Sequence, residues 1–245
     1  NNNSNEGIFL SASQVNLKYT TIESNGGYEL LVKASSGTIE HLTVKSSSNI
    51  GVYVHDISSS ITLAYIDIFL SNCNGYGIYV MDSNDISLHR INAKGNMRAG
   101  IGILSCNDVT IDEVYIENQN GFGIQITTSS NVLVKESGIM NTGYDAIIVE
   151  DCSGYVEIYH NGIAFSAISG VYVTGCSNVN ISHNILYSNY YGVYIRSDST
   201  VSVENNDFID NSYSKEAVDQ GSNTFFGNYW SRYSGVGAYY IDSDS

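Results

Sequence analysis

Two aspartates have the type and spacing of a catalytic carboxylate pair. Asp85 and Asp108 each lie eight residues after a glycine, and the two glycines are 23 residues apart. If the chain repeats with that period, the carboxyl groups lie about 5 Å apart, as in a retaining glycosidase. The same pair suits Ca²⁺. Asn131 and Asn178 continue the position, so we interpret it mainly as a turn that prefers Asp or Asn, with a cation site and catalysis as alternatives.

A second group of side chains has the chemistry of a metal site. Glu136, His160 and His183 recur at one position of successive repeats. Carboxylate and imidazole groups bind zinc or copper ions, so the three are candidate ligands. Polar and charged residues continue the position, as on a solvated ridge: Arg90, Glu113 and Asn205. We therefore expect no cofactor, with a divalent cation as the alternative.

Three of the four cysteines also share a position, six residues after the start of a repeat: Cys106, Cys152 and Cys176. Cys152 and Cys176 fall on adjacent repeats, at a spacing that a disulfide can bridge. Reduced thiols stacked inside a turn are the favoured interpretation, and a disulfide is the alternative.

Four tyrosines each lie two residues after a glycine, between apolar neighbours that face inward: Tyr53, Tyr79, Tyr172 and Tyr194. Their rings therefore point outward and form a largely uncharged flank. Such a stripe stacks on sugar rings or packs laterally against another protein. The alternative, weighed equally, is that tyrosine simply suits a β surface.

These spacings follow from an internal repeat. A glycine (once an alanine) that precedes alternating apolar residues recurs from position 77 onward in steps of 22 to 24. Two further short alternating segments follow in each repeat, and period-two alternation in short runs predicts strands. Three short strands per repeat of about 23 residues predict an all-β parallel β-helix of about ten coils over residues 1–222, with essentially no helix. The repeats start at Gly7, Gly51, Gly77, Gly100, Gly123, Ala146, Gly170 and Gly192.

Stacking such coils brings equivalent residues into columns. Asn161, Asn184 and Asn206 each lie three residues after the last inward residue of the second strand. Their amides can hydrogen-bond up and down the stack, so we predict an asparagine ladder. Proline would remove a hydrogen-bond donor in almost any coil, which explains its absence.

The last segment, residues 223–245, is rich in aromatic residues and is predicted to cap the same domain. The first coil begins almost at once, at Gly7, and exposes unpaired backbone groups. The aromatic end can fold over the last coil or dock on the bare first coil of another copy, which gives head-to-tail filaments. Lateral pairing through the tyrosine column is a variant. The end-contact residues are Phe225, Phe226, Tyr229, Trp230 and Tyr233.

Composition excludes several function classes. Ten Lys and Arg against 25 Asp and Glu give a net charge of −15, so we expect no nucleic-acid partner. No stretch approaches the roughly 20 apolar residues of a membrane span. No signal segment opens the chain, which reads as a mature product or as part of something larger.

The repeat resembles the right-handed parallel β-helix proteins, which include pectate-lyase-like enzymes and NosD-like periplasmic and cell-surface proteins. The segment from Asn178 to Asn189 reads like the NosD-like core repeat, and the segment from Asn223 to Tyr233 is similar to the one that closes many such domains. Arg232 stands where that family usually has an acidic residue. The resemblance implies a right-handed helix and a secreted or cell-surface location.

For function, the resemblance leaves three classes open. The sequence lacks Pro and has neither an Asp-Asp pair nor a Gly-His-Gly corner, which counts against the usual catalytic motifs. We therefore expect a structural or adhesive module, such as a filament subunit or a carbohydrate-binding surface, without lyase activity on uronate polymers. The alternatives are a polysaccharide-active enzyme (a lyase, glycoside hydrolase or epimerase) and a metal-handling module.

Overall fold

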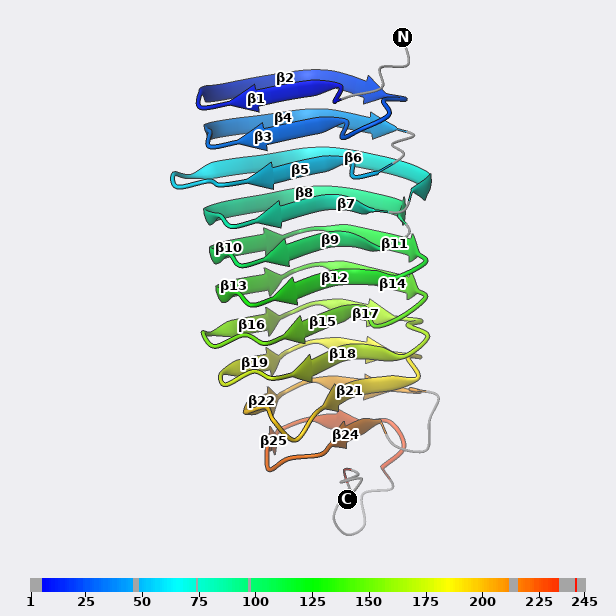
Figure 1. Ribbon diagram of the computed structural model, residues 1–245. Helices are drawn as coiled ribbons and strands as arrows, with labels where there is room; N and C mark the ends of the chain where they lie inside the picture. Colours follow the sequence, from blue (N-terminus) through cyan, green and yellow to red (C-terminus); the bar gives the residue numbers. More distant parts are fainter. Residues whose placement is uncertain are drawn as a thin grey trace.

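The short alternating segments form strands, and each strand pairs in parallel with its equivalent in the next coil. The computed structural model describes residues 6–45, 49–73, 75–96, 98–211, 216–233 and 241. Within them there is no helix, and so none that is long and apolar enough to cross a membrane. Figure 1 shows the coils stacked in sequence order between the two termini. The fold is the predicted parallel β-helix.

The first strand of every coil belongs to a ten-stranded sheet. Its register repeats the sequence period, since Ile78 pairs with Ile101 and Ile101 with Ile124. The ten strands enclose about nine turns of about 23 residues, against the ten coils predicted. In order they are β1 (Ile8–Ser11), β3 (Leu30–Lys33), β5 (Val52–His55), β7 (Tyr76–Met81), β9 (Ala99–Leu104), β12 (Phe122–Thr127), β15 (Ile147–Glu150), β18 (Ser169–Thr174), β21 (Tyr191–Ile195) and β24 (Ala217–Asp219).

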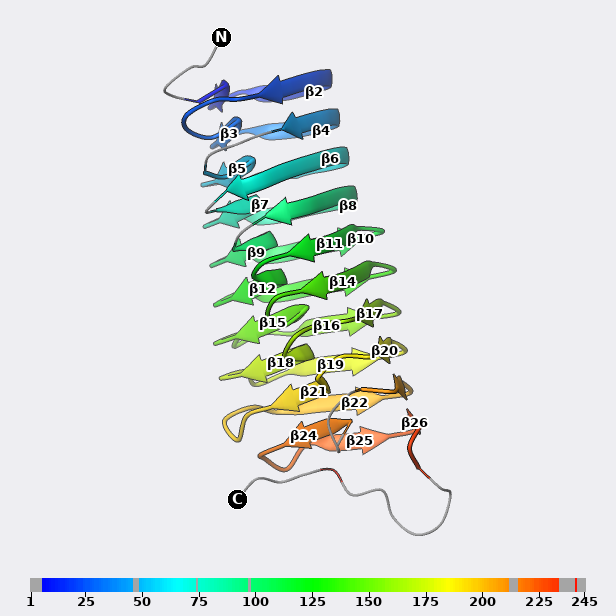
Figure 2. The ribbon, with the colours of Figure 1, turned by 90° about the vertical axis from the view of Figure 1, so that its right-hand side faces the viewer.

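A sixteen-stranded sheet forms the other two sides of each coil. In the first four coils one long strand runs through the corner between these sides: β2 (Gln14–Glu23), β4 (Ser36–Lys45), β6 (Ile61–Cys73) and β8 (Asn84–Asn96). In later coils the corner divides it in two, as Figure 2 shows. Those pairs are β10 (Asn107–Asp112) and β11 (Tyr115–Gln119), β13 (Ser130–Lys135) and β14 (Gly138–Thr142), β16 (Val156–Tyr159) and β17 (Gly162–Ala164), β19 (Val179–Ser182) and β20 (Ile185–Tyr187), β22 (Val201–Glu204) and β23 (Asp207–Ile209), and β25 (Thr224–Phe226) and β26 (Tyr229–Trp230).

That corner is made by one residue per coil in the left-handed backbone conformation, with φ between 50° and 58°. We call these nine residues the corner column. All of them point away from the core. None is glycine, although glycine adopts the left-handed conformation with the least steric strain. They are Tyr19, His41, Tyr65, Arg90, Glu113, Glu136, His160, His183 and Asn205.

The residue after each corner residue turns inward, and we call this position the corner slot. From the second coil of the column onward the slot is buried. It holds Leu42, Ile66, Ile91 and Val114 in the N-terminal half, then Ser137, and finally Asn161, Asn184 and Asn206. The rest of the core is a continuous set of aliphatic side chains from the inward positions of all three strands.

The asparagines form a ladder. The side-chain amide of Asn161 donates to Asn184 at 3.0 Å, and that of Asn184 donates to Asn206 at 3.0 Å. The ladder continues one coil further, because the Asn206 amide donates to Asn228 Oδ1 at 3.1 Å. Strands β25 and β26 pair with β22 and β23, so the first part of the segment expected as a cap supplies the last coil.

Candidate functional site

The outward tyrosines of the ten-stranded sheet lie in one column of its register. Tyr53 pairs with Tyr79 and Tyr172 with Tyr194, and in each pair the rings stack, with centroids 5.5 Å and 5.6 Å apart. Three other residues separate the two pairs: Gly102, Gln125 and Ile148. The column is therefore two short stacks with an interruption between them.

Gly102 leaves a gap at the edge of the first stack, and the ring of Tyr76 fills it. Tyr76 opens β7 and stacks on Tyr79, with ring centroids 4.5 Å apart. A Cβ atom at position 102 would lie 2.5 Å from Tyr76 Cε1 and 2.9 Å from Tyr79 Cδ2. Carbon atoms in contact prefer about 3.5–4.0 Å, so the absent side chain is what admits the ring.

The Tyr76 hydroxyl begins a chain of hydrogen bonds that links several coils. It donates to Gln125 Oε1 at 2.9 Å, and Gln125 Nε2 donates to Glu150 Oε2 at 3.3 Å. The Thr127 hydroxyl lies 3.5 Å from the same carboxylate oxygen. The chain fixes the orientation of the Gln125 amide and connects the aromatic group to a carboxylate.

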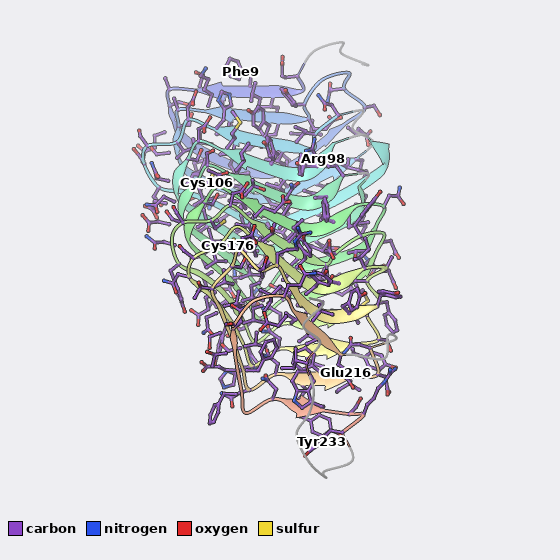
Figure 3. The ribbon with its side chains drawn as sticks, turned by 60° about the horizontal axis from the view of Figure 1, so that its bottom comes forward. Phe9, Arg98, Cys106, Cys176, Glu216 and Tyr233 are labelled. Carbon is purple, nitrogen blue, oxygen red and sulfur yellow. The ribbon has the colours of Figure 1, made fainter. Side chains whose placement is uncertain are left out.

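A hollow of about 130 Å³ lies at this group, and Tyr76, Tyr79, Arg98 and Gln125 line it. The guanidinium carbon of Arg98 is 5.1 Å from the centroid of the Tyr76 ring, a cation–π contact. No ion pair joins Arg98 to a carboxylate of the described residues. Figure 3 shows Arg98 in the N-terminal half of the stack, far from Glu216 and Tyr233. An arginine placed in this way suits an anionic ligand group.

The two phenols of the hollow are hydrogen-bond donors. Burial raises the pKa of Tyr76 to about 12, although Arg98 acts in the opposite direction. Burial also raises the pKa of Tyr79. Both rings therefore keep their hydroxyl protons at neutral pH.

Asp85 and Asp108 lie on adjacent coils, at the corner that follows the first strand. Both are exposed and have a left-handed backbone, as does Asn131 in the next coil. Asp108 accepts hydrogen bonds from the side chains of Asn107 at 2.7 Å and Asn131 at 3.1 Å. Neither aspartate lines the hollow, and their surroundings are those of a turn.

The metal candidates are spread along the corner column. His160 and His183 both contact the ring of Tyr159, with centroids 5.7 Å and 5.4 Å away. Among the described residues, the group whose ligand atoms come within 4.8 Å of one another is a different one: His89, Asp112 and Glu113.

That second group already has cationic partners. Arg90 Nε lies 2.7 Å from Glu113, and Lys135 Nζ lies 3.6 Å from Asp112. A metal ion would have to displace both cations, so we interpret the group as an ion-pair network on the surface.

The disulfide between Cys152 and Cys176, the lesser alternative from the sequence, is absent: both thiols are free and buried. The Cys152 Sγ lies 3.3 Å from the carbonyl of Glu150, and Cys176 Sγ lies 3.1 Å from that of Thr174. Each thiol thus lies beside a carbonyl of its own turn, as the hydroxyl of Ser129 does at the same position, and Cys176 Sγ also lies 3.6 Å from the Val149 carbonyl of the neighbouring coil.

Of the five aromatic end residues, two cover the core. Trp230 stacks on Phe208 with centroids 4.2 Å apart, and Phe225 packs beside it. The other three are exposed: Phe226, Tyr229 and Tyr233. The head-to-tail contact stays a prediction that rests on these exposed rings.

Sequence reasoning missed Tyr76, Arg98 and Glu150 as parts of a site. The signal was Gly102, a residue without a side chain in a column of tyrosines. A missing side chain in such a column leaves room for a large neighbour, and the ring of Tyr76, which pairs in register with Ala99, is the nearest in space.

The family model described as a right handed beta helix region matches three overlapping stretches of the chain, residues 6–163, 66–208 and 169–245. No curated protein matches the chain by sequence.

Several solved structures share the fold at low sequence identity. The A-module of mannuronan C-5 epimerase AlgE6 from Azotobacter vinelandii is 20% identical, with a TM-score of 0.70 over 85% of this chain and 63% of that one. The GH87 α-1,3-glucanase from Streptomyces thermodiastaticus is 11% identical, with a TM-score of 0.62 over 90% of this chain and 49% of that one. The periplasmic alginate epimerase AlgG is 11% identical, with a TM-score of 0.51 over 91% and 77%. The chain thus spans less than two thirds of the epimerase module.

Proposed function

Because this chain belongs to the family of right-handed β-helix proteins, we propose that it is a polysaccharide-active protein which binds an acidic polysaccharide on the outer face of its ten-stranded sheet. The binding site is the hollow of Tyr76, Tyr79, Arg98 and Gln125. The observation that carries the proposal is Arg98, whose guanidinium lies over a ring at this hollow without an ion-pair partner among the described residues.

The chemistry of the hollow suits a uronate. A guanidinium binds a carboxylate through two parallel hydrogen bonds, which gives both energy and orientation. The neighbouring tyrosine rings offer apolar surface to the C–H face of a sugar, and their hydroxyls offer donors. The remaining surface is acidic and would repel an anionic polymer elsewhere, so Arg98 would set where the chain binds.

The names of the structural neighbours support polysaccharide chemistry over the structural or adhesive module favoured by the sequence. Hydrolysis by a pair of carboxylates is not expected at the hollow, because no carboxylate lines it. The groups present would instead bind a uronate: Arg98 would pair with its carboxylate, and the tyrosine rings would contact the sugar. A secreted or cell-surface location belongs to the same proposal.

Binding of alginate and polygalacturonate, measured by titration calorimetry, tests the proposal. We expect Arg98→Gln to weaken binding about tenfold, the effect of losing one charge-assisted hydrogen bond. Arg196→Gln changes another exposed arginine, outside the hollow, and should bind like the unaltered protein. Proton NMR spectra of the incubated polymers would report epimerised or unsaturated products. The proposal is wrong if neither polymer binds, or if both variants bind equally well.

A further inference from the structure

The N-terminal half of the corner column carries a stack of aromatic rings on a different face of the molecule. The rings of Tyr19 and His41 lie 4.7 Å apart and nearly parallel, and those of His41 and Tyr65 lie 4.8 Å apart. The stack is on the surface, since Tyr19 is 79% exposed and Tyr65 is 41% exposed. It belongs to β2, β4 and β6 of the sixteen-stranded sheet, whereas the hollow at Arg98 belongs to the ten-stranded sheet.

Arg90 closes the stack and fixes its last ring. Its guanidinium carbon lies 5.3 Å from the centroid of the Tyr65 ring, and its Nη1 donates to the Tyr65 hydroxyl at 2.9 Å. Its Nε donates to Glu113 at 2.7 Å. Tyr65 is therefore held before any ligand arrives, which lowers the entropy lost on binding.

A row of small polar side chains runs beside the stack, on the outward positions that follow the corner in β4, β6 and β8. Thr43 pairs in register with Asp67, and Asp67 with Asn92. The Asn92 amide donates to Asp67 at 3.2 Å, whereas the buried Asn92 Oδ1 has no hydrogen-bond partner among the described atoms. Between the row and the stack lies a hollow of about 380 Å³, lined by His41, Leu42, Thr43, Tyr65, Asp67 and Arg90.

The fold does not need aromatic residues at these positions. A bulky residue in the left-handed conformation is strained by about 1–2 kcal/mol relative to the right-handed one. Asn205 makes the same corner near the other end of the column, and asparagine tolerates this conformation better. The corner itself therefore does not require an aromatic ring, since Arg90, Glu113 and Glu136 also adopt the left-handed conformation.

We propose that this hollow is a second saccharide-binding site, which takes a neutral pyranose unit of a glycan. Its carboxylate, hydroxyl and imidazole groups pair with sugar hydroxyls, and the rims of the rings contact the C–H surface of the sugar. The ligand is neutral because the charge of Arg90 is already balanced by Glu113, while Asp67 would repel a uronate. The two faces of the helix thus differ in the sugars that they select. This inference goes beyond the acidic polymer proposed for the first face.

Titration with neutral hexasaccharides of glucan, mannan and galactan tests the second site. We expect at least one to bind, and Tyr65→Asn and Asp67→Asn each to weaken that binding about tenfold. Asparagine suits the left-handed corner, so Tyr65→Asn removes the ring and leaves the backbone unstrained. The matched control is His183→Asn, which also introduces asparagine in the corner column and should bind like the unaltered protein.

The two sites are separable in this experiment. Arg98→Gln should leave binding of the neutral sugar unchanged, whatever its effect on an acidic polymer. The inference is overturned if no hexasaccharide binds. It is also overturned if Tyr65→Asn and Asp67→Asn, both folded by circular dichroism, bind as tightly as the unaltered protein.

Discussion

The two halves of the helix build the same corner from different chemistry. In the N-terminal half the corner slot is filled by Leu42, Ile66 and Ile91, and one strand runs through the corner. The backbone pairing there skips the corner residue alone and resumes at the slot, since Leu42 pairs with Ile66 and Ile66 with Ile91. In the C-terminal half the slot holds Asn161 and Asn184, and the strand is divided.

The difference teaches that a side-chain amide can replace a backbone acceptor. The backbone N–H of Asn161 donates to Asn184 Oδ1 at 2.9 Å, and the N–H of Asn184 donates to Asn206 Oδ1 at 2.9 Å. Each amide therefore supplies the acceptor that a continuous strand would provide from its main chain. Aliphatic burial stabilises the corner in one half, and hydrogen bonding stabilises it in the other.

Exchanging the two chemistries should have the largest effect. Ile66→Asn places an amide between Leu42 and Ile91, where it finds no side-chain partner, and removes a fully buried apolar side chain. We expect a loss of about 4 kcal/mol in the free energy of unfolding, measured by urea denaturation followed by circular dichroism. Ile66→Val is the control, with a loss of about 1 kcal/mol. Equal losses in the two variants would contradict the comparison.

Interrupting the ladder should be the next most damaging change. Asn184→Ala removes the side-chain acceptor of the Asn161 N–H, which leaves this buried donor unpaired, and it also removes the amide that donates to the Ile158 carbonyl. We expect a loss of about 3 kcal/mol. Asn178→Ala, at an exposed position, should change stability by less than about 0.5 kcal/mol. If the ladder does not stabilise the corner, the two variants will have the same free energy of unfolding.

The halves also differ at the residue that precedes each repeat start, which is Ile50 or Ala99 in one half and Asp145 in the other. Burial raises the pKa of Asp145, against the hydrogen bond from Ser169 N to its Oδ1 at 2.8 Å. The folded state thus binds the Asp145 proton more tightly than the unfolded state does. Protonation of Asp145 therefore stabilises the fold fully below the ordinary aspartate pKa. This stabilisation is lost as the pH rises through the raised pKa of the folded state.

Asp145→Asn keeps the acceptor oxygen and cannot ionise. We therefore expect the variant to gain stability relative to the unaltered protein as the pH rises from acid to neutral. Unfolding curves across that range measure the difference. Parallel pH profiles for the two proteins would show that Asp145 does not titrate in this way.

The smallest effect is expected at the turn shared by cysteine and serine. Cys106 N donates to Ser129 Oγ at 3.1 Å, and Cys152 N donates to Cys176 Sγ at 3.4 Å, so the two residue types fill the same role. Cys152→Ser should change stability by less than about 0.5 kcal/mol. A loss above about 2 kcal/mol would mean that the thiol does more than fill this position.

The fold could be predicted because the spacing of equivalent residues along the sequence determines the register between coils. Parallel pairing forces equivalent positions into columns, so the recurrence of Asn161, Asn184 and Asn206 is enough to predict their ladder. The change from Asn161 to Ile91 in the same slot could not be interpreted in advance, because a buried aliphatic residue is expected at any inward position.

The hollow at Arg98 could not be predicted from the sequence, for another reason. Spacing predicts which residues share a column, but Tyr76 leaves its own column and lies across the gap at Gly102. The disulfide alternative failed similarly: Cys152 and Cys176 are on adjacent coils, but both thiols are free and lie beside backbone carbonyls, in their own turns and, for Cys176, at Val149 of the neighbouring coil. Side-chain direction depends on packing between coils, which no spacing encodes.

The uniform parallel pairing has a mechanical consequence. Among the described strands, the backbone hydrogen bonds between coils run along the helix axis, and each strand pairs only with its equivalents in the two neighbouring coils. Tension applied between the ends would therefore load one inter-coil interface after another and peel the coils singly, as in a zipper. Force applied across the axis would instead load many strands at once in shear. We therefore expect the molecule to resist force across its axis better than tension along it.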